Sequence, residues 1–451
     1  MSTPVELAAV ELLGRGRMNP WLHADAQGVA LGRLTEAGEY QLITSERLAL
    51  DAKAAGPALA TRPRCYVPLV GRWADSDAEE WLTTGQAPTF SEVLALTVRA
   101  LDSHLELPRR EHRALLATWA VGTYFFPLFL SYPRLSLSGE RGCGKSKLLT
   151  LLAATAWNGY LALMPTPAVL FRLIHEYRLT LLLDEVEGFD KEDARDILAI
   201  INSGYKAGGS VPRVEGKDER RVESFSVFAP LALAAIKAPN STTEDRCIPV
   251  VMQRGADRAR INSEVDSRAE TFGALRSGCY RLLLTRWREV MATYETASLP
   301  EWLNSRAREL WRPLLALAAV ADAEPDSLAL TEDLLALARE HVADRDDLSA
   351  EAEALLDELA VRLGDCASVV IRPGELREPL RARLGWRDAP ASHAVGAWLR
   401  RLGLRRDGKD RDGARYVVTA EQLREVTGRY TPERNVTTSS SPPMCSVSLG
   451  R

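Results

Sequence analysis

The chain has 451 residues, of which 26% are charged, and its formal net charge is only −4. This length allows two or three domains with a large buried core, and the nearly balanced charge excludes an argument for nucleic-acid binding from net charge alone. The six cysteines form no C-x-x-C pair and the six histidines do not cluster, so we expect a reducing, cytoplasmic setting and no structural zinc site.

Residues 1–88 are predicted to form a small N-terminal module of unclear fold. Short apolar segments, such as residues 40–44 and 66–70, alternate there with glycine and proline, which is compatible with an α+β arrangement. The chain does not open on a basic stretch followed by an apolar one, so we expect no signal peptide.

Residues 89–133 are predicted to be a helical lead-in to the next domain. The helical pattern begins at Thr89, with Ser91 as the predicted N-cap, and continues to Leu130. Within it, the uncharged residues 115–132 are about long enough to cross a bilayer, but Pro127 interrupts them. We therefore expect a helix buried against the adjoining sheet, and no membrane partner.

The most specific motif is G-E-R-G-C-G-K-S at residues 139–146, which fits the pattern G-x-x-x-x-G-K-[ST]. A predicted strand at residues 134–138 precedes it and a predicted helix at residues 147–154 follows it, the order that phosphate binding requires. Glycines let successive backbone N–H groups point at phosphate oxygens, and the helix N-terminus adds its dipole. The motif predicts ATP and Mg²⁺ as cofactors, with ATP bound by Gly139, Gly142, Cys143, Gly144, Lys145, Ser146 and Lys147.

The predicted hydrolytic site combines two residues of this motif with two acidic residues further along the chain. Lys145 is expected to reach the β and γ phosphates, and Ser146 to ligate Mg²⁺. Residues 179–183 are apolar except for Thr180 and end at Asp184 and Glu185, as expected of a buried parallel strand that opens onto the same site. Asp184 is predicted to hold Mg²⁺ through water, and Glu185 to polarise the attacking water. Alternating strands and helices over residues 134–254 predict an α/β core with a parallel, doubly wound sheet.

Two β-type runs flank a charged turn between residues 210 and 225, which predicts a hairpin with Lys217 at its tip. Such a turn is often simply solvated. Alternatively, a hairpin between two core strands would project into the channel of a ring and contact nucleic acid there. The next apolar run, residues 227–236, predicts a buried strand that leads to Asn240, the predicted sensor of the γ-phosphate, with Lys237 as the second candidate.

Arg246 precedes another apolar strand, residues 248–252, and is predicted to stabilise transition-state charge on the nucleotide of a neighbouring subunit. The alternative is a salt bridge to Asp245 or Glu244. An arginine acting across an interface favours a homo-oligomeric ring over a monomeric kinase. The catalytic candidates are therefore Lys145, Glu185, Asn240 and Arg246.

Helical patterns over residues 268–293, 301–321 and 326–342 predict a helical lid or subdomain, residues 255–347. Residues 348–432 then show three helices, a short β segment and a hairpin at residues 404–418, which predict a winged-helix domain. The remaining residues 433–451 are rich in Ser, Thr and Pro and are expected to be disordered.

Positive charges are concentrated near the third helix and the hairpin of the predicted winged helix. Phosphate contacts from such residues would give salt-dependent binding to single-stranded or duplex DNA with little sequence preference. Solvated arginines in an arginine-rich chain are the alternative. The nucleic-acid candidates are Arg400, Arg401, Arg405, Arg406, Lys409, Arg411 and Arg415, together with Lys217.

The order of these motifs resembles that of the AAA+ ATPases, especially the superfamily-three helicases of viruses and plasmids. More closely, residues 225–236 and 244–248, with the carboxyl-terminal segments 398–404, 413–416 and 429–430, resemble a family of predicted helicase-like ATPases from mobile elements and prophages. The resemblance covers about residues 115–430. It does not cover residues 1–88, where no primase or Toprim catalytic cluster is found.

This resemblance implies a P-loop NTPase core of AAA+ type with a helical lid and a C-terminal winged-helix domain. It implies an oligomeric ATPase motor that acts on DNA, helicase-like or translocase-like, in replication or maintenance of a mobile element. A different class of function stays open, because an ATP-dependent DNA-binding switch or a protein remodeller also needs the P-loop. Only the motor needs the tip of the hairpin at Lys217.

Overall fold

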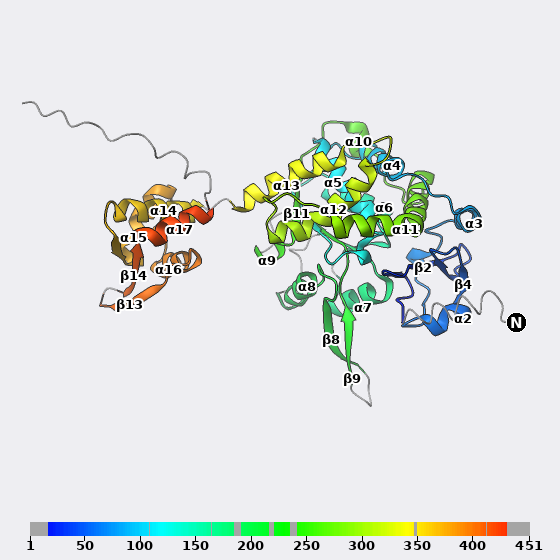
Figure 1. Cartoon of the computed structure of the whole chain (residues 1–451), viewed down its shortest axis with the longest axis horizontal. Coiled ribbons are helices and arrows are strands. Elements are labelled where there is room, and N and C mark those ends of the chain that lie inside the picture. Colours follow the sequence, from blue (N-terminus) through cyan, green and yellow to red (C-terminus); the bar gives the residue numbers. More distant parts are fainter. Residues whose placement is uncertain are drawn as a thin grey trace, which may run out of the picture. The chain divides into compact units, whose positions relative to one another are not determined.

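The computed structural model describes two compact units of the chain, residues 1–341 and residues 342–451 (Figure 1). Three of the predicted functional residues, Glu185, Lys217 and Asn240, lie outside the described residues. The described residues are 17–107, 109–163, 165–184, 191–215, 221–234, 241–346, 350–411 and 413–430.

A four-stranded antiparallel sheet, in the order β1-β2-β3-β4, begins the first unit. Buried Arg33 joins this sheet to helix α3, because its Nη2 pairs with Asp75 at 2.6 Å and its Nη1 donates to the carbonyl of Trp73 at 2.9 Å. The N-terminal residues are thus packed into the first unit. Their elements are β1 (Leu22–Ala24), β2 (Val29–Leu34), β3 (Tyr40–Thr44), β4 (Ala49–Asp51), α2 (Ala52–Ala55), η1 (Gly56–Ala58), η2 (Val67–Leu69) and α3 (Asp75–Thr84).

Helix α4 (Phe90–Asp102) starts from a capping box. Thr89 Oγ1 accepts a hydrogen bond from the backbone N–H of Glu92 at 3.1 Å, and the Glu92 carboxylate accepts one from the N–H of Thr89 at 2.8 Å. The prediction of Ser91 as N-cap was therefore wrong by two residues, because the Thr-x-x-Glu spacing satisfies two amide groups at once.

Helix α5 (Arg110–Gly122) is buried and packs against α4 and α12 (Ser305–Asp322). The predicted helix to Leu130 is wrong in its last part. The helix ends at Gly122, where the chain packs so closely that a Cβ atom would lie 2.3 Å from the hydroxyl of Tyr132. The chain then turns through the 3-10 helix η3 (Phe126–Leu128), which contains Pro127. Among the described residues, no helix combines the length and the apolar character that crossing a membrane needs.

The central sheet has five parallel strands in the order β11-β5-β10-β7-β6, which confirms the predicted α/β core. Strand β10 begins only at Leu231, later than predicted, because Pro230 has no N–H to give to a neighbouring strand. The elements of the core are β5 (Arg134–Ser138), α6 (Lys145–Thr155), β6 (Gly159–Leu163), α7 (Pro167–Tyr177), β7 (Thr180–Asp184), α8 (Lys191–Ser203), β10 (Leu231–Ala234), α9 (Ser241–Glu244) and β11 (Cys247–Val251).

A two-stranded ribbon, β8 (Ser210–Glu215) with β9 (Arg221–Ser226), projects from the first unit (Figure 1). It confirms the predicted hairpin. Val214 and Val222 lie opposite each other in the register and are 62% and 73% exposed. The predicted tip of the hairpin, with Lys217, lies outside the described residues.

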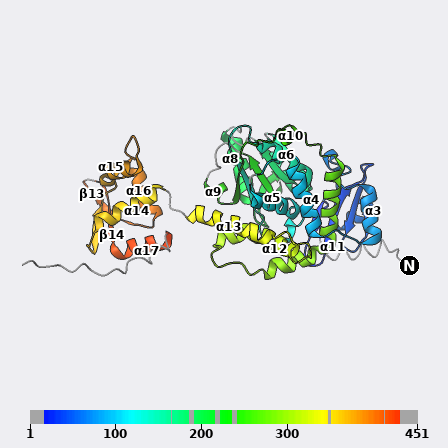
Figure 2. The ribbon, with the colours of Figure 1, turned by 90° about the horizontal axis from the view of Figure 1, so that it is seen from above.

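Helix α11 lies between the N-terminal strands and the P-loop helix α6 (Figure 2). Its Arg276, which is buried, donates to the carbonyls of Arg72, Ala154 and Ser267. Arg72 in turn donates to the carbonyl of Ala156 at 2.8 Å. These arginines hold the last carbonyls of α6 in place. The helices of this part are α10 (Arg258–Asn262), α11 (Glu270–Thr296), α12 (Ser305–Asp322) and α13 (Leu330–Asp346).

Glu324 caps α4 from a distant part of the sequence. Its two carboxylate oxygens accept hydrogen bonds from the N–H groups of Phe90 at 3.0 Å and Ser91 at 2.8 Å, and Arg286 pairs with it at 3.0 Å. Burial by itself raises the pKa of Glu324, but the hydrogen bonds from Ser91, Phe90 and Arg286 outweigh burial and leave the pKa lowered. The charged form is therefore the one that the fold favours.

We expect the substitution Glu324→Gln to lower the free energy of unfolding by about 1–2 kcal/mol at neutral pH. Because the folded pKa of Glu324 is depressed, its contribution is present above the unfolded value of about 4.3 and is lost as the pH falls through the folded value. Urea unfolding of both proteins at about pH 7 and about pH 3.5 checks this. The difference between them should shrink at the lower pH, and a difference that stays constant would contradict the assignment.

The second unit has a three-stranded sheet in the order β12-β14-β13, covered by helices. Its core includes Leu359, Leu376, Val395 and Tyr416, all buried. The predicted hairpin is confirmed by β13 and β14; helix α17 was not predicted. The elements are α14 (Ala350–Leu363), β12 (Ser368–Ile371), α15 (Pro373–Leu384), α16 (Ser392–Arg401), β13 (Arg406–Asp410), β14 (Gly413–Thr419) and α17 (Ala420–Tyr430).

Candidate nucleotide-binding site

The loop between β5 and α6 has the conformation that the glycines of its motif permit. Gly139 and Gly144 have φ angles of +141° and +93°, which side chains rarely adopt. A Cβ atom at Gly139 would also lie 2.3 Å from the carbonyl oxygen of Met252. Gly144 forms the N-cap of α6, so the free N–H groups of the first helical turn open onto the loop.

Lys145 lies across this loop. Its Nζ donates to the carbonyl oxygens of Gly139 at 2.7 Å and Glu140 at 3.2 Å, and it lies 3.7 Å from the Cys143 sulfur. The ammonium group therefore stands beside the backbone that the motif assigns to phosphates. A lysine in this place can neutralise phosphate charge without a large movement of the backbone.

A cavity of about 790 Å³ adjoins the loop. The predicted residues Asp184, at the end of β7, and Ser146, in the first turn of α6, both line it. The cavity is lined by His104, Leu105, Glu106, Arg141, Gly142, Cys143, Gly144, Lys145, Ser146, Lys147, Asp184, Ala234, Met252, Gln253, Arg254, Gly255 and Ile261. Of the predicted ATP-binding residues, only Gly139 is not in this lining, and it shapes the loop.

The donor set fits Mg²⁺. A hydroxyl from Ser146 and a carboxylate from Asp184 face one cavity, and Mg²⁺ commonly takes one or two protein oxygens with phosphate oxygens and waters as its other ligands. No cluster of three or more His, Cys, Asp or Glu side chains that could hold a metal by themselves occurs in the described part of the chain. The site thus has the composition of a nucleotide–Mg²⁺ site.

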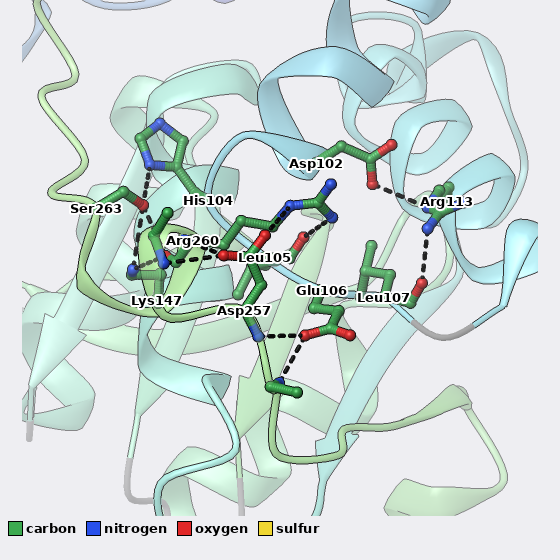
Figure 3. Close-up of polar contacts among 12 residues, drawn as sticks. Asp102, His104, Leu105, Glu106, Leu107, Arg113, Lys147, Asp257, Arg260 and Ser263 are labelled. Atoms are coloured by element: carbon green, nitrogen blue, oxygen red, sulfur yellow. Dashed lines mark hydrogen bonds and ion pairs between the residues drawn. The ribbon is translucent and has the colours of Figure 1, made fainter.

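One wall of the cavity comes from the segment after α4, which the sequence did not identify (Figure 3). The carboxylate of Glu106 accepts hydrogen bonds from the N–H groups of Ala256 at 2.7 Å and Asp257 at 3.0 Å, just before α10. The hydrogen bonds from Asp257 and Ala256 lower the pKa of Glu106. Glu106 thus ties the α4–α5 connection to the segment after β11.

Lys147 takes part in the same wall (Figure 3). Its Nζ donates to the carbonyls of Arg260 at 2.9 Å and Ile261 at 2.8 Å, at the end of α10. The ring of His104 contacts Ser263 nearby at 2.9 Å, and burial together with the charge of Lys147 lowers the pKa of His104. The ammonium group of Lys147 is therefore held by the end of α10.

Arg246 is not among the residues that line the cavity. Cys247 pairs with Arg134 at the start of the central strands, whereas the P-loop follows the other end of β5 at Ser138. A five-residue strand is about 17 Å long. The structure therefore brings Lys145, Ser146 and Asp184 together at the end of the sheet where its parallel strands finish. Arg246 lies at the opposite end, where the strands begin.

In the second unit, the predicted basic residues divide into two groups. Arg400 donates to the hydroxyl of Tyr416 at 3.2 Å, Arg406 donates to the carbonyl of Gly408 at 2.8 Å, and Arg415 pairs with Asp407. These three are held within the unit. The four that are exposed with no ion pair to a described residue are Arg401, Arg405, Lys409 and Arg411.

No family model matches the chain, and no curated protein matches it. Among solved structures, SCCmec type IV Cch, described as an active helicase, has 12% identity and a TM-score of 0.48, with 91% of this chain and 80% of that chain covered. The apo C-terminal region of NrS-1 has 12% identity and a TM-score of 0.35, with 74% and 76% covered. Cdc6p from Pyrobaculum aerophilum has 14% identity and a TM-score of 0.23, with 72% and 94% covered. Because these identities and TM-scores are low, the likenesses assign the chain neither a family nor an activity.

Proposed function

We propose that this chain is a Mg²⁺-dependent ATPase of AAA+ type that acts on DNA. The observation that carries the proposal is the cavity that Lys145, Ser146 and Asp184 share at the carboxyl edge of a parallel sheet. Ligands of such sheets bind at this edge, and the glycine loop with the start of α6 offers backbone N–H groups to phosphates. The narrower proposal is a helicase-like motor in replication or maintenance of a mobile element.

The chain's own residues divide the chemistry among them. Lys145 binds the β and γ phosphates, and the N–H groups from Gly142 to Ser146 orient them for in-line attack. Ser146 and Asp184 would hold Mg²⁺, which neutralises phosphate charge when bound. Glu185, which directly follows Asp184, accepts the proton of the attacking water.

Strand β10 pairs with both β5 and β7, so its carboxyl end at Ala234 lies between the strand that leads to the P-loop and the strand that ends at Asp184. This order of strands supports the proposal of Asn240 as the residue that senses the γ-phosphate. Arg246 immediately precedes β11, at the end of the sheet where its parallel strands begin, and there it would serve the nucleotide of a neighbouring copy rather than that of its own copy.

For DNA, the proposal rests on the second unit. Its helix-strand-helix-helix-hairpin order supports a winged helix, and Arg401, Arg405, Lys409 and Arg411 are exposed on the end of α16 and the hairpin. Exposed guanidinium and ammonium groups of this kind bind phosphates without reading bases. Lys217, which the sequence places in the turn between the two ribbon strands, is the proposed second contact.

The test is ATP hydrolysis by the full chain with and without single-stranded DNA, together with a variant in which Arg401, Arg405, Lys409 and Arg411 are changed to Ala. We expect DNA to stimulate the wild type. The variant should keep its basal rate of hydrolysis. The slope of its DNA affinity against salt concentration should be smaller, by an amount equivalent to up to about four phosphate contacts. The variant keeps Arg400, Arg406 and Arg415, whose side chains bond within the second unit, so the contacts that hold this unit together are not removed.

Two outcomes of this experiment would redirect the proposal, and a third would contradict it. If the wild type binds DNA but its rate of hydrolysis does not change when DNA is added, an ATP-dependent switch or a protein remodeller would be favoured over a motor. DNA binding by the variant with an unchanged salt dependence would remove the proposed wing contacts. Absence of hydrolysis in the wild type would contradict the ATPase itself.

A further inference from the structure

The turn between α15 and α16, in the second unit, presents a tryptophan ring to solvent. Of the ten tryptophans in the chain, all of which the structure describes, seven are at most 1% exposed. Trp386 is the most exposed of the ten, at 36%. Tryptophan has a large apolar surface, and a ligand that covers the exposed part of the ring would take this surface out of water.

The end of α15 fixes the backbone of Trp386. Gly385 has a φ angle of +63°, and its N–H donates to the carbonyl of Ala382 at 3.4 Å. The N–H of Trp386 donates to the carbonyl of Arg381 at 3.1 Å. These two hydrogen bonds form a Schellman motif, with the glycine in its left-handed position. The place of the ring is therefore set by the end of a regular helix.

The ring of Trp398, on α16, holds the ring of Trp386 from one side. The two ring centroids are 6.1 Å apart and the ring planes are inclined at 66°, which is an edge-to-face arrangement. Trp398 is partly buried and packs against the core of the second unit. An edge-to-face partner covers at most one face of a ring, and no other ring of the described residues contacts Trp386. The exposed part of Trp386 can therefore be covered by another flat group.

Positive side chains flank this pair of rings. Arg387 follows Trp386 directly. Arg401 lies three residues after Trp398 on α16, a spacing at which helical side chains are neighbours. Both arginines are exposed, and neither forms an ion pair with a described residue. The turn also carries exposed Asp388, so the excess of positive charge comes from the end of α16. An open ring beside guanidinium groups matches a nucleotide, which combines a flat base with an anionic phosphate.

We propose that Trp386 is a stacking site for an unpaired base, which adds to the affinity for single-stranded DNA but not to that for duplex DNA. The inference rests on the proposed action on DNA. In a duplex each base is already stacked between its neighbours, whereas a base of a single strand is free to lie on a protein ring. Trp398 is a positioning residue for Trp386, and Arg387 and Arg401 bind the phosphates next to the stacked base.

The test measures the affinity of the full chain for three probes at several salt concentrations. They are a labelled single-stranded DNA oligonucleotide, the same oligonucleotide annealed to its complement, and a single-stranded RNA of the same sequence. Trp386→Ala should weaken binding of the single-stranded DNA about fivefold or more, and Trp386→Phe should weaken it less because a smaller ring remains. Binding of the duplex should not change.

The matched control is Val361→Ala. Val361 is another exposed apolar side chain of the second unit, on α14, and it is 67% exposed. If only the loss of exposed apolar surface mattered, this variant would also bind single-stranded DNA more weakly. We expect it to bind all three probes like the wild type.

Salt dependence separates stacking from phosphate contact. Because stacking on a ring releases no counterions, Trp386→Ala should lower the affinity for the single strand by the same factor at every salt concentration. Arg387→Ala should instead reduce the slope of log affinity against log salt concentration, by about one phosphate contact. An unchanged slope in Trp386→Ala would also show that the second unit keeps its fold. Binding of the single strand should quench the tryptophan fluorescence of the wild type more than that of Trp386→Phe.

Four results would overturn the proposal while leaving DNA binding standing. They are wild-type affinity of Trp386→Ala for the single strand, an equal loss of affinity for single strand and duplex, a changed salt slope in this variant, and tighter binding of the RNA that depends on Trp386. If Trp386→Ala bound DNA normally but changed the oligomeric state, the ring would be assigned to a contact between protein chains, and the proposal would also be overturned. A wild type that binds neither DNA probe would count against the proposed action on DNA itself.

Discussion

Replacing Lys145 with Ala should reduce ATP hydrolysis by about 10²-fold or more, because one charged donor to the transferred phosphoryl group is lost. The expectation rests on the place of Nζ, within 2.7–3.2 Å of the carbonyls of Gly139 and Glu140, where the motif puts the phosphates. The neighbouring Lys147 is different, since its ammonium group bonds the end of α10. Steady-state hydrolysis and equilibrium binding of an ATP analogue measure the effect.

The matched control for Lys145→Ala is Lys53→Ala, which removes an exposed lysine on α2 of the N-terminal part. Its hydrolysis rate should equal that of the wild type. If Lys145→Ala hydrolysed ATP at the wild-type rate with wild-type affinity, Lys145 would not contact phosphates, and the cavity would have to be assigned to another ligand.

Replacing Arg276 with Ala should lower the free energy of unfolding of the first unit by about 3 kcal/mol or more. The side chain is buried and donates to three carbonyls, at 2.9 Å to Arg72, 3.0 Å to Ala154 and 3.1 Å to Ser267. Removing it leaves these acceptors buried without their donor and opens a cavity. The three carbonyls belong to the N-terminal part, the P-loop helix and the segment before α11, so the loss affects their common junction.

Urea unfolding followed by tryptophan fluorescence checks this expectation. Arg288→Ala serves as the control, because it removes an exposed arginine from the same helix and should change stability by about 0.5 kcal/mol or less. Equal midpoints for the two variants would mean that the junction does not depend on Arg276.

The parts of the fold that could be predicted from the sequence are those determined by local pattern. The strand at residues 134–138, the glycine loop and the helix after it follow one another in the chain, and their chemistry depends on neighbours in sequence. The same holds for the run of leucines that ends at Asp184, whose continuous apolar character is typical of a strand buried on both faces.

The parts that could not be predicted depend on contacts between distant residues. Glu106 and Asp257 are 151 positions apart, and no local pattern marks either as part of the cavity wall. Tyr205 and Arg306 are likewise 101 positions apart, in a loop and on helix α12, yet Arg306 donates to the hydroxyl of Tyr205. Only the folded chain shows that these side chains share one place.

Errors at the ends of elements had local physical causes that the sequence contained. The spacing of Thr89 and Glu92 marked the true start of α4, and Pro127 with Gly122 marked the end of the helix that was extended too far. Hydrophobic periodicity alone did not resolve these, because buried residues continue on both sides of the break.

The most direct test of the ATPase proposal is a crystal or cryo-EM structure of the full chain with Mg²⁺ and a non-hydrolysable ATP analogue. We predict that the phosphates contact the backbone N–H groups between Gly142 and Ser146, that Lys145 turns onto them, and that Ser146 and Asp184 face the metal ion. A nucleotide bound away from this loop, or none bound at saturating concentration, would contradict the proposed function.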